Sequence, residues 1–244
     1  MAFTVAVVGA SGRLGSVITG VVESTPGAEL LAALTSKDRI DRALAADVVV
    51  DATHPAVSPG IVAAAVERGK RVLVGTSGWS EPRLATLRGQ ISASPGSAAV
   101  VIPNFSLGSA LATGFATVAA RYFGSAEIIE AHHPGKVDSP SGTAVRTAEL
   151  MARSAPRPFS APHADQRARG QQVGGVPIHS LRLEGVVAKQ EVRFGGTGEI
   201  LTITHETLSS SSYEAGIRAS LLRTAEISDE LVIGLDAVLG LTFP

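Results

Sequence analysis

The stretch FTVAVVGASGRLG, residues 3–15, decides the fold of this chain. Residues 3–8 are a short, uninterrupted apolar and β-branched run, which is typical of a strand buried on both faces of a parallel sheet. Glycines then follow at the spacing G-x-x-G-x-x-G, and the next residues have helical apolar periodicity. In that order, the glycines let the backbone approach a pyrophosphate, and the helix N-terminus receives its charge. A tight turn with helix-packing glycines is the alternative interpretation.

Strand and helix patterns continue to alternate after this stretch. Strands are predicted over 29–34, 47–51, 71–74 and 98–102, and helices over 56–67 and 81–91. This alternation predicts a parallel sheet with right-handed crossovers, in which ligands bind beyond the carboxyl ends of the strands. Three strand ends are therefore candidate coenzyme contacts, although each alone is more often only a turn: Thr53 to Pro55, Gly75 to Ser77 and Pro103 to Phe105.

The residues after the second predicted strand bear on the choice of coenzyme. An NAD-binding fold commonly places an acidic residue there, about twenty residues after the glycine turn, to bond the adenosine ribose. This chain has Thr35, Ser36 and Lys37 instead. Because two hydroxyls and an ammonium suit a phosphate, we expect NADPH to be accepted at least as well as NADH. Asp38 could still reach the ribose, so NADH stays an option.

Composition bounds the class of protein. The 244 residues suffice for one large domain or two modest ones, and we expect two. A formal net charge of -1 predicts no binding to nucleic acid or to an anionic membrane. The absence of cysteine excludes disulfides, thiolate metal sites and a cysteine nucleophile, and we expect no metal. The N-terminus shows no basic leader and no apolar run is long enough to span a bilayer, so we expect a cytoplasmic protein.

A second stretch, EIIEAHHPGKVDSPSGTA over residues 127–144, concentrates the usable chemistry. A predicted strand ends in His132 and His133, a Pro-Gly break leads to Lys136, and Ser141 begins a predicted helix. Alone, each of these is more often a packing, solvated or capping residue. Together they offer a proton donor, a cation and free helix amides, which predicts a site for a small carboxylate.

The rest of the chain predicts a second kind of domain. A packed helix is expected over 107–123, and residues 154–176 are expected to form a long surface loop. Residues 177–206 read as strands with turns, which we interpret as antiparallel sheet, so the second domain should contain an open mixed sheet with a face that another subunit could cover. Arg182 and Lys189 are expected on a solvated face, with substrate contact as the alternative. A helix over 213–227 and a strand over 231–234 should return to the first sheet.

The chain resembles the 4-hydroxy-tetrahydrodipicolinate reductases of the diaminopimelate route to lysine. EIIEAHHPGKVDSPSGTA is similar to that family's signature, and GASGRLG, DATHP, VGTSG, IPNFSLG and GEILTITHET extend the resemblance over nearly the whole chain. It departs from the family at Ala52, near Thr35 and at Pro134-Gly135, which bears on coenzyme packing and on the loop before Lys136. The resemblance implies a homotetrameric NAD(P)H enzyme that closes over its ligand by hinge motion. The expected dinucleotide-binding domain (Rossmann-type, α/β) covers 1–105 and 214–244, and the α+β substrate-binding and oligomerisation domain covers 106–213.

The resemblance also implies roles for individual residues. His132 is similar to the family's acid/base and Lys136 to its proton donor. The residues expected to bind substrate, from the resemblance or from their place at the predicted helix start, are His133, Ser141, Gly142 and Thr143. The expected coenzyme contacts are Gly9, Ala10, Ser11, Gly12, Arg13, Leu14, Thr35, Ser36, Lys37, Thr53, Gly75, Thr76, Ser77, Ile102, Pro103, Asn104 and Phe105. A non-catalytic NAD(P)H-sensing regulator, or another imine or aldehyde reductase, are the alternatives.

Overall fold

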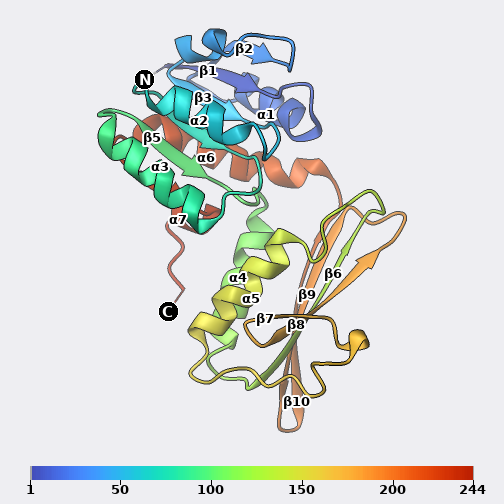
Figure 1. Cartoon of the computed structure of the whole chain (residues 1–244). Helices are drawn as coiled ribbons and strands as arrows, with labels where there is room; N and C mark the ends of the chain where they lie inside the picture. The colour runs from blue at the N-terminus through green and yellow to red at the C-terminus, as the bar shows by residue number, and fades with distance from the viewer. Residues whose placement is uncertain (1, 244) are drawn as a thin grey trace. The chain divides into compact units, whose positions relative to one another are not determined.

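The computed structural model describes residues 2–243, which divide into two compact units (Figure 1). The first unit runs to Leu107 and resumes over Ser210–Leu241, and the second covers Gly108–Ser209 and the last residues described. Each unit is built on its own sheet and has its own apolar core.

The first unit contains a six-stranded sheet of order β11-β5-β4-β3-β1-β2, in which every pairing is parallel. Its strands are β1 (Phe3–Val8), β2 (Ala28–Leu34), β3 (Val48–Asp51), β4 (Arg71–Val74), β5 (Ala98–Val101) and β11 (Leu231–Ile233). The predicted parallel sheet and the return of the last strand beside β5 are confirmed. Because β1 pairs with β2 on one side and β3 on the other, the strand order reverses at β1, which is where such sheets bind ligands.

Helices cover both faces of this sheet. They are α1 (Arg13–Glu23), α2 (Ser58–Val66), α3 (Glu81–Ala93), α6 (Glu214–Glu226) and the short α7 (Leu235–Val238), with 3-10 turns η1 (Ile40–Ala45) and η3 (Ser210–Tyr213). The helices α2 and α3 contact each other and the strands on one face, while α1 and α6 contact each other (Figure 1). The buried valines of β3 and β4 pack against Val62 and Leu87 of the first pair. Full burial on both faces explains why these strands read as continuous apolar runs.

The second unit contains a five-stranded sheet of order β10-β9-β6-β8-β7. Its strands are β6 (Ser125–His132), β7 (Gln171–Val173), β8 (Val176–Arg182), β9 (Ala188–Gly196) and β10 (Glu199–Thr207). The helices α4 (Leu107–Ala119) and α5 (Gly142–Ser154) contribute small residues to a core with Ile128, Ile178 and Phe194. The expected open mixed sheet is therefore confirmed.

Two expectations for this unit were wrong in detail. The antiparallel interpretation of residues 177–206 holds for β9 and β10 but not for the pairing of β8 with β6, which is parallel; the long connection through α5 allows a crossover that a hairpin does not. Residues 154–176 are not only loop, because they contain η2 (Arg167–Arg169) and β7, and Phe159 is buried. Their mixed Pro, Gly and Arg content obscures a three-residue strand that depends on pairing with β8.

Candidate active site

Strand β6 places Glu130 and His132 on the same face, because side chains two residues apart in a strand point the same way. Glu130 is fully buried, and its Oε2 lies 2.6 Å from His132 Nδ1. An ionised carboxylate only accepts hydrogen bonds, so Nδ1 carries the proton and Nε2 is the nitrogen that can exchange one. Sequence reasoning missed Glu130, although its position two residues before His132 was a usable signal.

Burial and neighbouring charges set the protonation of this pair in opposite ways. Burial lowers the pKa of His132, the cations Lys136 and Arg182 lower it further, and Glu130 acts in the other direction. Burial alone would raise the pKa of Glu130, but hydrogen bonds from Arg182, Ser180 and His132 outweigh it and hold that pKa below its ordinary value. The site thus holds an ionised carboxylate beside an imidazole that favours the neutral form.

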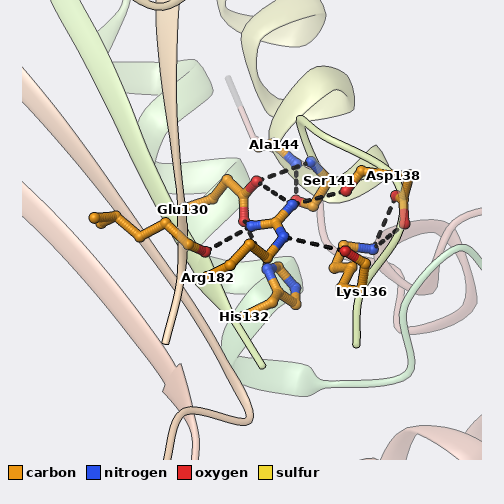
Figure 2. A network of polar contacts seen from close by, with 8 residues as sticks. Glu130, His132, Lys136, Asp138, Ser141, Ala144 and Arg182 are labelled. Carbon is orange, nitrogen blue, oxygen red and sulfur yellow. Dashed lines mark hydrogen bonds and ion pairs between the residues drawn. The ribbon is translucent and has the colours of Figure 1, made fainter. Parts of the chain in front are cut away.

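Arg182, the last residue of β8, lies opposite His132 of the neighbouring strand β6 (Figure 2). Its Nη1 and Nη2 each lie 3.0 Å from one Glu130 oxygen, which makes a two-pronged ion pair. Nη2 also donates to the carbonyl of Asp138 at 2.7 Å, and Nε to that of Lys136 at 3.4 Å. The expectation of a solvated Arg182 is therefore wrong: pairing with a buried carboxylate draws the guanidinium inside.

Lys136 stands in the loop that follows β6. The amide of Lys136 donates to the carbonyl of His133 at 3.1 Å, so the Pro134-Gly135 break forms a tight turn. Lys136 Nζ lies 2.7 and 2.8 Å from the two carboxylate oxygens of Asp138 (Figure 2). Burial would raise the pKa of Asp138, but the Lys136 ammonium outweighs it and lowers that pKa. The ammonium predicted as a proton donor thus belongs to the same network as His132.

The start of α5 holds the predicted substrate residues. Ser141 is 3% exposed, its Oγ accepts from the amide of Ala144 at 3.2 Å, and its own amide donates to Glu130 Oε1 at 3.3 Å. Ser141 is thus a helix cap tied to the network, and its direct contact with substrate stays a prediction. Gly142 is exposed and Thr143 half-buried in the first turn, where amides lack intrahelical partners. His133 is half-buried, and its ring lies close to Gly135.

The glycine turn of the first unit fits a dinucleotide. Gly9 has φ +87°, and a Cβ there would lie 2.3 Å from the carbonyl oxygen of Ala52. A Cβ on Gly15 would lie 2.0 Å from the carbonyl oxygen of Gly9, so α1 packs directly on the turn. Gly12 caps α1 without a side-chain hydrogen bond to the first-turn amides. Close backbone approach and a helix start without a side-chain cap are what a pyrophosphate requires.

The ends of β4 and β5 meet beside this turn. A Cβ on Gly75 would lie 2.9 Å from Phe105 Cε2 and 3.1 Å from Leu14 Cδ2, so three predicted coenzyme segments converge there. Within these segments, Asn104 Oδ1 accepts from the amide of Ser106 at 2.9 Å. The side chains differ in exposure: Thr76, Ile102 and Phe105 are buried, Ala10, Leu14, Gly75 and Asn104 are half-buried, and Ser11, Gly12, Arg13, Ser77 and Pro103 are exposed.

Asp51, at the end of β3, organises the neighbouring strand ends and was missed by sequence reasoning. Its buried carboxylate accepts hydrogen bonds from the hydroxyls of Thr53 and Ser58. The Thr53 amide donates to Thr76 Oγ1 at 2.8 Å, and Trp79 Nε1 donates to Ser58 Oγ at 3.0 Å. Thr53 and Thr76 are thus held by a buried network, and their contact with coenzyme stays a prediction. A buried carboxyl group needs such hydrogen-bond partners, because an unpaired polar group is costly to bury.

At the end of β2, the Asp38 carboxylate is engaged within its own loop. The amide and hydroxyl of Thr35 donate to Asp38 Oδ2 at 2.9 and 3.0 Å, and Arg42 donates to Oδ1 at 2.9 Å. The Thr35 amide is the main cause of a lowered pKa at Asp38, with Arg42 adding to it. Ser36 and Lys37 are exposed. This arrangement is compatible with a phosphate at Ser36 and Lys37.

Within residues 2–243, no three His, Cys, Asp or Glu side chains are grouped so as to hold a metal ion. None of the helices in that range combines the length and apolar character needed to traverse a lipid bilayer.

Two family models match the chain. The model described as "Dihydrodipicolinate reductase, N-terminus" covers residues 3–105, and that described as "Dihydrodipicolinate reductase, C-terminus" covers residues 108–239. A protein of Clavibacter michiganensis named 4-hydroxy-tetrahydrodipicolinate reductase is 56% identical over 99% of this chain and 87% of its own length. A Streptomyces avermitilis protein of the same name is 43% identical over 97% of this chain and 98% of its own.

A solved structure is similar across both units. It is a dipicolinate-bound dihydrodipicolinate reductase from a Paenisporosarcina species, with a TM-score of 0.80 and 29% identity. The match covers 97% of this chain and 99% of that one.

Proposed function

Because the chain belongs to the dihydrodipicolinate reductase family, we propose that His132 and Lys136 perform the proton chemistry of that family's reaction. The protein is an NAD(P)H-dependent 4-hydroxy-tetrahydrodipicolinate reductase of lysine and diaminopimelate biosynthesis. One observation carries this proposal: buried Glu130 bonds His132 Nδ1 at 2.6 Å within the network that also includes Lys136. Family membership disfavours the two alternatives, a non-catalytic NAD(P)H-sensing regulator and another imine or aldehyde reductase of the same architecture.

Residues 1–105 and 214–244, most of which lie in the first unit, are proposed as the dinucleotide-binding domain. Its glycine turn from Gly9 to Leu14, with Gly75 and Phe105 beside it, would hold the coenzyme, and Ser36 and Lys37 would bond a ribose phosphate. We therefore propose that NADPH serves at least as well as NADH. When bound, the coenzyme supplies the hydride that reduces the conjugated imine left after the substrate loses water.

Residues 106–213, most of which lie in the second unit, are proposed to hold the substrate dicarboxylate. Gly142 and Thr143 would offer first-turn amides to one carboxylate, and His133 with Lys136 would contribute further hydrogen bonds and charge. The dipicolinate in the similar Paenisporosarcina structure, itself a ring with two carboxylates, supports this ligand class. Negative charge that develops on the ring during reduction requires a proton, which Lys136 donates, or His132 once its Nε2 is protonated.

Site-directed variants test the division of roles. We expect His132→Gln and Lys136→Ala to lower kcat by about 10²- to 10⁴-fold, the usual contribution of a positioned proton donor. The dissociation constant for NADPH should change little in both. Arg153→Ala, an exposed cation in the last turn of α5, is the matched control and should keep normal turnover. Near-normal kcat in both site variants would refute the assignment.

We also propose that the enzyme is a cytoplasmic homotetramer. The tetramer is the state expected from the family resemblance, and the cytoplasm is where reduced nicotinamide coenzymes supply biosynthesis. The sheet of the second unit supports assembly, because the face turned away from α4 and α5 exposes Leu181 and Ile200. Exposed apolar side chains on an open sheet face favour a surface that another subunit covers.

A further inference from the structure

We propose that Glu130 and Arg182 are positioning residues for this reaction: together they fix the His132 imidazole and the Lys136 loop relative to each other, and Arg182 does not bind a substrate carboxylate. This inference rests on the proposed roles of His132 and Lys136. It concerns two residues that touch neither substrate nor coenzyme in the proposal and act through other side chains.

The guanidinium of Arg182 has no donor left for a ligand. An arginine carries five N–H donors. Nη1 donates to Glu130 Oε2 at 3.0 Å and to the Leu181 carbonyl at 2.6 Å. Nη2 donates to Glu130 Oε1 at 3.0 Å and to the Asp138 carbonyl at 2.7 Å, and Nε to the Lys136 carbonyl at 3.4 Å. A cation beside a dicarboxylate site would ordinarily be assigned to substrate binding, but here every hydrogen is engaged.

Glu130 connects the elements that carry the candidate site. Its Oε2 accepts from His132 Nδ1 on its own strand and from Arg182 on β8. Its Oε1 accepts from Arg182 and from the amide of Ser141 at the start of α5. One buried carboxylate therefore ties β6, β8 and α5 together (Figure 2). Because it accepts from Nδ1, it also holds the imidazole in the tautomer whose Nε2 faces outward for proton exchange.

Arg182 extends this connection to the loop. Its bonds to the carbonyls of Lys136 and Asp138 hold the backbone on both sides of Val137, while Val137 itself is 98% exposed. The loop therefore depends on Arg182 for the placement of Lys136 Nζ. Arg182→Lys would keep the charge, but the lysine ammonium is a single nitrogen. It cannot make both the two-pronged ion pair with Glu130 and the hydrogen bonds to the two loop carbonyls. A displacement of about 1 Å in such a site can cost about 10²-fold in rate.

Kinetics of Arg182→Lys separate positioning from substrate binding. We expect kcat to fall about 10²-fold, with a smaller rise in the KM for substrate because the displaced Lys136 also contacts the carboxylate in the proposal. Arg169→Lys is the matched control, because Arg169 pairs with Glu127 of the same strand, away from His132, and it should leave kcat unchanged. A raised KM with unchanged kcat would overturn the inference and make Arg182 a carboxylate ligand.

A readout on His132 itself does not depend on activity. The charged groups that face this imidazole are Glu130 from β6, Lys136 from the loop and Arg182 from β8. In Glu130→Gln the interaction that raises the pKa of His132 is lost, so nitrogen-15 NMR should show that pKa falling and the proton no longer confined to Nδ1. An unchanged tautomer and pKa would overturn the inference while leaving the proposed function intact. Normal turnover in His132→Gln would instead overturn the proposed function.

Loss of one partner leaves the other charge buried, which can prevent folding. The double variant Glu130→Gln with Arg182→Met removes both charges and is the version to use in that event. We expect it to fold, to bind NADPH normally and to show the same roughly 10²-fold loss of kcat. A folded double variant with normal kcat would show that the pair is only structural.

Discussion

At the scale of single residues, two half-buried imidazoles make the protein sensitive to acid. His132 has a pKa below its ordinary value of 6.5, chiefly through burial, and burial likewise lowers the pKa of His205, whose ring packs on Gly108. A group with a lowered folded-state pKa binds fewer protons when folded than when unfolded. The stability it contributes is therefore complete above about pH 6.5 and is lost as pH falls through the folded pKa.

We accordingly predict that the free energy of unfolding is constant just above pH 6.5 and declines as pH falls below it. The carboxylates with lowered pKa values, Glu127, Glu130 and Asp138, act in the same direction but in a more acidic range, below their ordinary values of 4.5 and 3.8. Urea unfolding at a series of pH values measures this decline, and His205→Gln should make it shallower just below pH 6.5. Stability that rises on acidification through this range would contradict the prediction.

At the scale of elements, two glycines of helix α1 differ in the atoms that an added Cβ would contact, and therefore in the cost of replacing them. A Cβ on Gly15 would lie 2.0 Å from the Gly9 carbonyl oxygen, whereas nothing lies within 4 Å of one on Gly20 in the same helix. Gly15→Ala must therefore push α1 off the glycine turn.

We predict that Gly15→Ala destabilises the protein by about 1–3 kcal/mol, a typical cost of overpacking, and abolishes tight NADPH binding. Gly20→Ala, at an exposed position of the same helix, is the control; it should stabilise by about 0.5–1 kcal/mol and leave coenzyme binding unchanged. Fluorescence of Trp79, the single tryptophan, reports unfolding of the first unit, and NADPH titration measures binding. Equal effects of the two substitutions would remove the packing argument.

The residue that caps α5 also ties this helix to strand β6. Ser141 bonds the Ala144 amide as a helix cap should, but its own amide also donates to Glu130. A residue that reads as a simple cap therefore also fixes the helix relative to the strand that carries His132.

At the scale of the whole molecule, one face of the second sheet is packed against α4 and α5, and the opposite face exposes apolar side chains to solvent in a single chain. Ile200 is 75% exposed at the β9–β10 hairpin and points away from the helices that cover the other face. We predict that Ile200→Lys converts the proposed tetramer into smaller species, because a desolvated ammonium would oppose burial of this face. Sedimentation velocity measures the mass.

The control for this substitution is Leu31→Lys, which places the same charge at an exposed apolar position on β2 of the first unit. It should leave the mass unchanged. If Ile200→Lys and Leu181→Lys both retained the wild-type mass, the open face would not be the assembly surface.

The sequence by itself determined what depends on local pattern. Buried apolar runs and the glycine turn predicted the parallel sheet, because strands covered on both faces need no alternation. The stretch around His132 predicted a candidate site, because its chemistry is concentrated in one strand, loop and helix. The antiparallel pair of β9 and β10 was likewise readable from the glycine-rich hairpin that joins them.

Only the tertiary structure decided the partners that arrive from distant segments. Arg182 looked like a solvated residue and proved to be the ion-pair partner of Glu130, 52 residues away. The same holds for β7, which exists through pairing with β8, and for the parallel register of β6 and β8. The ion pair, strand β7 and the parallel register depend on which strands pair and which face of the sheet is buried. The local pattern of apolar residues determines neither.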